Sequence, residues 1–105
     1  MRDISVEELA RRRSEGEHFV LLDVRESDEL ATVKLAWATW IPMREIPARV
    51  GELDPETPVA VMCHHGGRSE RVAAFLSARG FADVVNVEGG IDAYAARIEP
   101  GLARY

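Results

Sequence analysis

The sequence predicts an α/β fold with three layers, in which helices cover both faces of a central, mainly parallel sheet of about five short strands. Two segments, 19–24 and 58–63, are almost continuously apolar, as is typical of strands buried on both faces. Segments with helical spacing lie between the predicted strands and indicate βαβ units. A chain of 105 residues can bury one core, so a single domain over residues 1–105 is expected.

Caps, glycines and prolines set the boundaries of the predicted elements. Ser5 followed by Glu8 forms a capping-box pattern before the first helix, and Pro47 interrupts the weakest helix. The predicted strands cover residues 19–24, 39–41, 58–63 and 83–87. The predicted helices cover residues 6–15, 26–32, 44–53, 69–79 and 91–97.

Composition and charge disfavour several classes of protein. The chain is 47% hydrophobic and 30% charged, which is ordinary for a globular domain. Its net charge of −5 disfavours nucleic acid as a partner, and no apolar run approaches the ~20 residues that span a bilayer. The first residues lack the apolar core of a signal peptide, and a single cysteine cannot form an internal disulfide. A cytoplasmic protein without membrane or nucleic-acid partners is therefore expected.

Residues able to carry chemistry lie at the ends of three predicted strands. Asp23 and Arg25 lie at the end of the first buried strand, Cys63 at the end of the second, and the segment 88–90 after the third. In parallel sheets of this kind, ligands bind beyond the carboxyl ends of the strands. We therefore expect these residues to meet at one edge of the sheet.

Cys63 is the only cysteine, and it stands between a predicted strand and a predicted helix. A loop that leads into a helix presents free backbone amides, and the helix dipole adds partial positive charge there. Gly66 and Gly67 are expected to let successive amides turn toward one point, where an anion would bind. With Arg68 nearby, the Cys63 thiol is expected to have a lowered pKa and to act as a thiolate nucleophile.

Two other interpretations of this segment are weaker. A lone cysteine at the end of a buried strand is usually a small core residue, but the glycine pair and Arg68 favour a reactive thiol. Contiguous Cys63, His64 and His65 could suggest a metal site, yet neighbouring side chains cannot readily converge on one ion. No metal is therefore expected.

Three segments carry motifs that occur in the same order in one known family. CHHGGRS, at 63–69, resembles an active-site loop, and LDVR at 22–25 with Glu29 resembles the first block of that family. NVEGGIDAY, at 86–94, resembles the last block, and residues 100–105 resemble the usual ending. The chain is thereby similar to the single-domain rhodaneses, which are sulfurtransferases. The resemblance covers nearly the whole chain and implies the rhodanese-like three-layer α/β/α fold.

The resemblance also implies a sulfurtransferase whose nucleophile is Cys63. The thiolate would take the outer sulfur of a donor such as thiosulfate or a persulfide, and a thiol or cyanide acceptor would then remove it. Arg68 would attract the anionic donor. The substrate- and persulfide-binding loop would consist of His64, His65, Gly66, Gly67, Arg68 and Ser69. No cofactor is implied, a monomer is expected, and a sulfur-relay protein is an additional candidate partner.

The expected roles within and around the loop differ. The two histidines would flank the mouth of the site. Ser69 would either donate a hydrogen bond to the sulfur cradle or cap the following helix, and the cap is favoured. Asp23 would orient the loop or pair with Arg25 or Arg68, without a catalytic role.

One segment departs from the family pattern. The family usually has Gly-His-Ile-Pro-Gly-Ala before the third strand, where this chain has VKLAWA at 33–38. The turn geometry of this segment is therefore not predicted. Trp37 and Trp40 are expected to pack on the core or to wall the pocket, and the core is favoured.

Four rival functions stand beside sulfur transfer. A cysteine phosphatase needs one more loop residue than the four that separate Cys63 from Arg68, and an arsenate reductase needs further cysteines. A docking module of this family usually lacks the cysteine. A persulfide carrier in a sulfur relay, with weak turnover of thiosulfate, is the main alternative.

Overall fold

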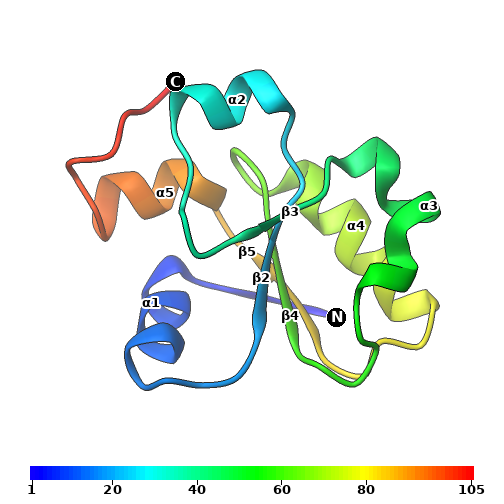
Figure 1. The fold of residues 1–105 in the computed structure, drawn as a ribbon. Coiled ribbons are helices and arrows are strands. Elements are labelled where there is room, and N and C mark those ends of the chain that lie inside the picture. The colour runs from blue at the N-terminus through cyan, green and yellow to red at the C-terminus, as the bar shows by residue number, and fades with distance from the viewer.

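Five short strands form one sheet in the computed structural model, which describes residues 1–105 (Figure 1). The strands are β1 (Arg2–Ile4), β2 (Val20–Asp23), β3 (Thr39–Trp40), β4 (Val59–Met62) and β5 (Val84–Val87). Their spatial order is β1-β5-β4-β2-β3, and every neighbouring pair runs parallel. The predicted α/β fold with a parallel sheet is confirmed.

Helices cover both faces of this sheet. They are α1 (Val6–Ser14), α2 (Ser27–Thr32), α3 (Ile46–Arg49), α4 (Gly67–Ala78) and α5 (Gly90–Arg97), with the 3-10 turns η1 (Met43–Glu45) and η2 (Val50–Glu52) beside α3. In Figure 1, α1 and α5 lie on one face, α3 and α4 on the other, and α2 beyond the carboxyl ends of the strands. None of the helices combines the length and the apolar character that crossing a membrane requires.

Alternating strand residues supply two cores, one on each face of the sheet. Leu22 and Val61 pack with the residues of α3 and α4, whereas Leu21 and Met62 pack with those of α1 and α5. Strands β4 and β5 are buried along their whole length. A strand covered on both faces has no polar side, which is why β4 is continuously apolar in the sequence and β5 has only one polar residue, Asn86.

Two elements differ from the sequence prediction. Strand β1 is not predicted, because only Ile4 of its three residues is buried and such a short edge strand carries little periodicity. The helix predicted over 44–53 is divided into η1, α3 and η2. Pro47 lies in the first turn of α3, where a missing N–H is tolerated, and it cannot lie in the interior of one longer helix.

Candidate active site

The carboxyl ends of β2, β4 and β5 bring the predicted site residues to one edge of the sheet. Asp23 is the last residue of β2 and lies in register with Met62, the last residue of β4. Cys63 follows directly, and the loop runs into α4 at Gly67. The free amides at the start of α4 therefore lie beside the thiol.

Cys63 lines an open cavity with a volume of about 350 Å³, although its own side chain is almost fully buried. Its Sγ accepts hydrogen bonds from the Gly66 amide at 3.1 Å and from the Ser69 hydroxyl at 3.3 Å. Burial raises the pKa of the thiol, but hydrogen bonds from the Ser69 hydroxyl and from the amides of Ser69, Gly66 and His65 outweigh burial. The pKa of Cys63 is therefore lowered, which favours the thiolate.

Of the two loop positions occupied by glycine, only one has a backbone conformation that requires glycine. Gly66 has φ of 115°, a conformation that side chains disfavour. Gly67 has an ordinary backbone and open space around its Cα. The expectation that both glycines are needed for the turn is therefore wrong for Gly67.

A third glycine, Gly90 at the start of α5, lets that helix approach the loop. A Cβ at Gly90 would collide with the carbonyl oxygens of Cys63 and His64. These carbonyls accept hydrogen bonds from the amides of Ile91 at 2.9 Å and Asp92 at 3.1 Å. The loop is thus held by its carbonyls, and its amides remain free to face the sulfur.

Ser69 is fully buried inside α4 and does not cap it. The helix begins at Gly67, and its N-cap residue, Gly66, makes no side-chain capping bond. The favoured cap role is therefore wrong. The hydroxyl lies 2.5 Å from Asn86 Oδ1 and 3.3 Å from Cys63 Sγ. Because a hydroxyl carries one proton, it can donate to only one of these acceptors at a time.

Asn86 on β5 is held in one orientation by its neighbours. Its Nδ2 donates to Asp3 Oδ1 at 3.1 Å and to the Gly66 carbonyl at 3.3 Å. These two acceptors require nitrogen on that side, so Oδ1 must face Ser69. The motif around Asn86 is visible in the sequence, but the contact with Ser69 is not, because the two residues meet only in the folded sheet.

Arg68 is held by Glu29. Its two terminal nitrogens donate to both oxygens of this carboxylate, at 2.6 Å and 2.8 Å. The Arg68 guanidinium is the main reason that the pKa of Glu29 is lowered to about 2. The positive charge of Arg68 is thus compensated, whereas Arg71 lines the same cavity without an ion-pair partner.

A buried ion pair lies beneath this surface contact. Arg25 Nη2 donates to Asp23 Oδ2 at 2.7 Å, and neither side chain reaches solvent, so the predicted pairing of Asp23 with an arginine is confirmed. Arg25 Nη1 also donates to the hydroxyl of Tyr105, which donates to Glu29 Oε2 at 2.7 Å. Burial is the main cause that raises the pKa of Tyr105 to about 12, so this hydroxyl stays protonated.

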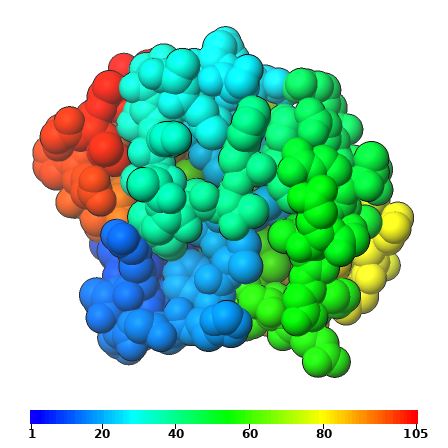
Figure 2. Space-filling model, viewed as in Figure 1, coloured from blue at the N-terminus to red at the C-terminus, as the bar shows by residue number.

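Tyr105 also covers one of the two loop histidines. Its ring stacks on the imidazole of His64 with centroids 3.8 Å apart and planes within 9°. His65 is largely exposed, with Nδ1 3.9 Å from Asp92 Oδ2. Figure 2 shows the last residues, in red, packed beside the cyan region that contains α2. The predicted position of the histidines, on the walls of the cavity, is confirmed.

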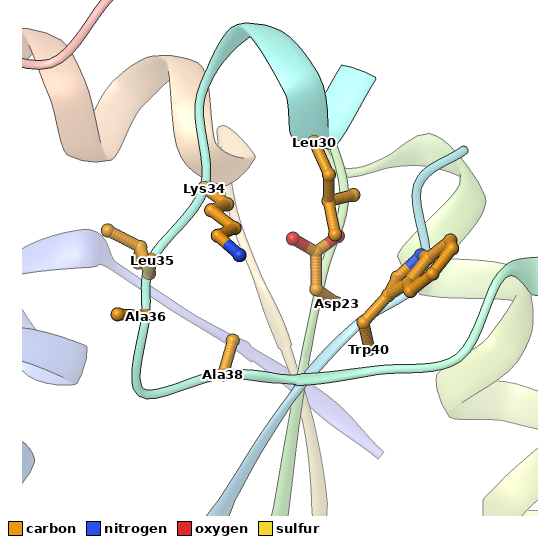
Figure 3. A pocket seen from close by; sticks show the side chains of 7 residues that line it. All are labelled: Asp23, Leu30, Lys34, Leu35, Ala36, Ala38 and Trp40. Atoms are coloured by element: carbon orange, nitrogen blue, oxygen red, sulfur yellow. The ribbon is translucent and has the colours of Figure 1, made fainter. Parts of the chain in front are cut away.

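The two tryptophans take different places. Trp37 is partly buried and packs on the core, edge-to-face with Phe19 at a centroid distance of 6.1 Å, which confirms the core prediction for this residue. Trp40 is 39% exposed, and its Nε1 donates to the Arg25 carbonyl at 2.8 Å. Trp40 instead walls a second cavity (Figure 3), separate from that of Cys63.

Residues 5–97 match the family described as rhodanese-like domain. The chain belongs to this family. A sulfurtransferase from Allochromatium vinosum is 34% identical to this rhodanese-like chain over 101 residues, which cover 96% of the chain and 94% of the relative. The rhodanese-like/PpiC domain-containing protein 12, chloroplastic, of Arabidopsis thaliana is 35% identical over 112 residues, but the chain spans only 38% of that protein.

A solved structure agrees with the fold. The crystal structure of a rhodanese-like domain protein from Staphylococcus aureus is 32% identical in sequence and superposes with a TM-score of 0.86. The superposition covers 100% of this chain and 99% of that chain. The rhodanese-like fold is thus supported along the whole chain, and the family includes proteins named as sulfurtransferases.

Proposed function

We propose that this rhodanese-like chain, acting as one domain over residues 1–105, is a sulfurtransferase that carries a sulfane sulfur on Cys63. The observation that carries the proposal is the set of donors around Sγ, namely the Gly66 amide at 3.1 Å and the Ser69 hydroxyl at 3.3 Å. Such donors stabilise a thiolate. The outer sulfur of a persulfide is also an anion, so the remaining loop amides and the N-terminus of α4 suit it as well.

In the first half-reaction, the Cys63 thiolate attacks the outer sulfur of a donor such as thiosulfate. The sulfur–sulfur bond of the donor breaks, its electron pair leaves with sulfite, and a Cys63 persulfide forms. In the second, a thiolate or cyanide attacks the outer sulfur of the persulfide and the Cys63 thiolate is regenerated. Neither step needs a cofactor, and the loop from His64 to Ser69 would bind the anionic sulfur in both.

The compensated charge of Arg68 suggests that this residue holds the loop rather than attracts the donor. Glu29 binds its guanidinium through two hydrogen bonds of 2.6 Å and 2.8 Å. We assign the first electrostatic contact with an anionic donor to Arg71, which lines the cavity and has no carboxylate partner.

A persulfide carrier in a sulfur relay is the second candidate function. One observation favours it: the Arg68 charge that would draw in doubly charged thiosulfate is compensated by Glu29. A carrier would form the persulfide in full but turn over thiosulfate slowly.

Thiocyanate formation from thiosulfate and cyanide tests the enzyme proposal. The wild type should form thiocyanate, and Cys63→Ser should form none. Arg71→Gln should raise the KM for thiosulfate several-fold, while Arg79→Gln, which removes the same charge just beyond the C-terminal end of α4, should not. Equal rates for Cys63→Ser and the wild type would contradict the proposal. Stoichiometric persulfide without turnover would favour the carrier.

A further inference from the structure

A second cavity, of about 140 Å³, lies at the carboxyl ends of β2 and β3 (Figure 3). Its walls are Asp23, Leu30, Lys34, Leu35, Ala36, Ala38 and Trp40. None of these residues lines the Cys63 cavity, so the two sites are separate. Most of the wall comes from the segment 33–38, in which this chain departs from the family pattern. The sulfur-transfer proposal assigns no role to this segment.

Lys34 supplies the one uncompensated charge of this cavity. It is the only lysine among the 13 lysine and arginine residues of the chain. Figure 3 shows its ammonium end pointing across the cavity toward Asp23. The Asp23 carboxylate, however, is occupied on both oxygens by Arg25, with Oδ1 3.0 Å from Nε and Oδ2 2.7 Å from Nη2. Lys34 forms no ion pair, and its side chain is accessible from solvent.

The rest of the wall is apolar and contains one fixed aromatic ring. The Trp40 indole is anchored by its hydrogen bond to the Arg25 carbonyl at 2.8 Å, so its position does not depend on an occupant. Leu30 and Ala38 close the cavity above and below in Figure 3. An apolar cavity of about 150 Å³ accepts one benzene-sized ring. A cavity of about 140 Å³ therefore suits a single ring or a branched chain of similar size.

We propose that this cavity binds a small organic carboxylate, with an apolar body the size of one aromatic ring beside Trp40 and its carboxylate on the Lys34 ammonium. An inorganic anion would leave the apolar walls without contacts. A neutral ligand would not use the free charge, and a cationic ligand would be repelled by it. This site is independent of Cys63, so the inference does not rest on the proposed sulfur transfer.

Benzoate is the probe, and the indole N–H resonances of the two tryptophans are the readout, assigned with Trp40→Phe. Benzoate should shift the Trp40 resonance in a saturable way, with Kd on the order of 1 mM for a ligand of this size. Trp37 should not respond, because its ring packs on the core beside Phe19. Cys63→Ser should bind benzoate as the wild type does.

Variants separate recognition of the carboxylate from filling of the cavity. Lys34→Gln should weaken benzoate binding about five- to tenfold, and neutral benzamide should bind both proteins as weakly as benzoate binds that variant. Arg79→Gln, the matched charge control, should bind benzoate normally. Ala38→Phe should fill the cavity and abolish binding while the Cys63 thiol remains reactive.

Three results would overturn the inference. The first is no response of Trp40 at ~10 mM benzoate, tenfold above the expected Kd. The second is equal benzoate affinity of Lys34→Gln and the wild type, which would mean that the lysine does not recognise the carboxylate. The third is unchanged binding by a folded Ala38→Phe protein, which would place the benzoate elsewhere.

Discussion

Replacing Ser69 by alanine is expected to raise the pKa of the Cys63 thiol by roughly one unit. The buried Ser69 hydroxyl is the only side chain that donates to Sγ, at 3.3 Å. A hydrogen bond to a charged group contributes roughly 1.5–3 kcal/mol, from which the neutral bond to Asn86 that the hydroxyl gives up subtracts roughly 0.5–1.5 kcal/mol. About 1.4 kcal/mol corresponds to one pKa unit. The backbone amides around the sulfur remain in this variant, so the shift reports the hydroxyl alone.

Replacing Asn86 by alanine is expected to move the same pKa in the opposite direction. When the thiol ionises, the single Ser69 proton must turn from Asn86 Oδ1, 2.5 Å away, to the sulfur. That step gives up a neutral hydrogen bond worth roughly 0.5–1.5 kcal/mol. Without the Asn86 acceptor this cost disappears, and the pKa of Cys63 should fall by up to about one unit.

The assay is the pH dependence of the alkylation rate by iodoacetamide, followed by mass spectrometry. The chain has one cysteine, so the rate reports Cys63 alone. The wild-type midpoint should lie below the ordinary thiol pKa of about 8.5. Ser77→Ala, on the same helix but outside the site, is the matched control. An unchanged midpoint in Ser69→Ala, or a higher one in Asn86→Ala, would refute the competition for the Ser69 proton.

Glu29→Gln should lower the stability to unfolding by on the order of 1 kcal/mol at neutral pH. Arg68 lowers the pKa of Glu29 from 4.5 to about 2. The stabilisation that ionised Glu29 gives the folded protein is therefore complete above pH 4.5 and is lost as the pH falls through about 2. Gly90→Ala should cost at least ~2 kcal/mol, as its φ of 60° and two loop carbonyls exclude a Cβ. Tyr105→Ala should speed modification of His64 by diethyl pyrocarbonate, whereas Tyr105→Phe, which keeps the stacked ring, should not.

Each of these three predictions has a control. Glu56 is an exposed carboxylate without an ion pair. The free energy of unfolding of Glu56→Gln, measured with denaturant, should therefore equal that of the wild type at every pH. Gly51→Ala should change stability by less than ~1 kcal/mol, since nothing lies within 4 Å of a Cβ there. For the tyrosine variants, the exposed His65 is the internal reference. A loss of stability in Glu29→Gln that does not change with pH would contradict the ion pair with Arg68. A Gly90→Ala protein as stable as the wild type would contradict the close approach of α5 to the loop. Equal rates of His64 modification in the wild type and both Tyr105 variants would contradict the stacking of Tyr105 on His64.

The fold and the position of the nucleophile could be predicted from the sequence because both depend on local pattern. Buried parallel strands give apolar runs, as in β4, and the glycine-containing turn after Cys63 marks the start of α4. Strand β1 could not be predicted, because it pairs with residues of β5 that lie more than 80 positions away in the sequence. The helix predicted over 44–53 is divided into three short elements for a local reason, which is the proline at the start of α3.

The contacts that tune the site could not be predicted, because they join side chains that are distant in sequence. Arg68 and Glu29 lie 39 positions apart, and Ser69 and Asn86 lie 17 apart. The sequence also could not decide between a capping and an interior position for Ser69. That choice depends on whether α4 begins before or after this residue, a difference of a single helical turn. The cavity beside Trp40 arises in a segment without a recognisable motif.

The most direct test of the central claim is the intact mass of the reduced protein after incubation with thiosulfate. The wild type should gain the mass of one sulfur atom and lose it again on addition of cyanide or a thiol. The Cys63→Ser variant should gain no mass. A wild-type protein that is folded, has a free thiol and gains no sulfur would contradict transfer from thiosulfate. A gain of sulfur by Cys63→Ser would show that Cys63 is not the residue that carries it.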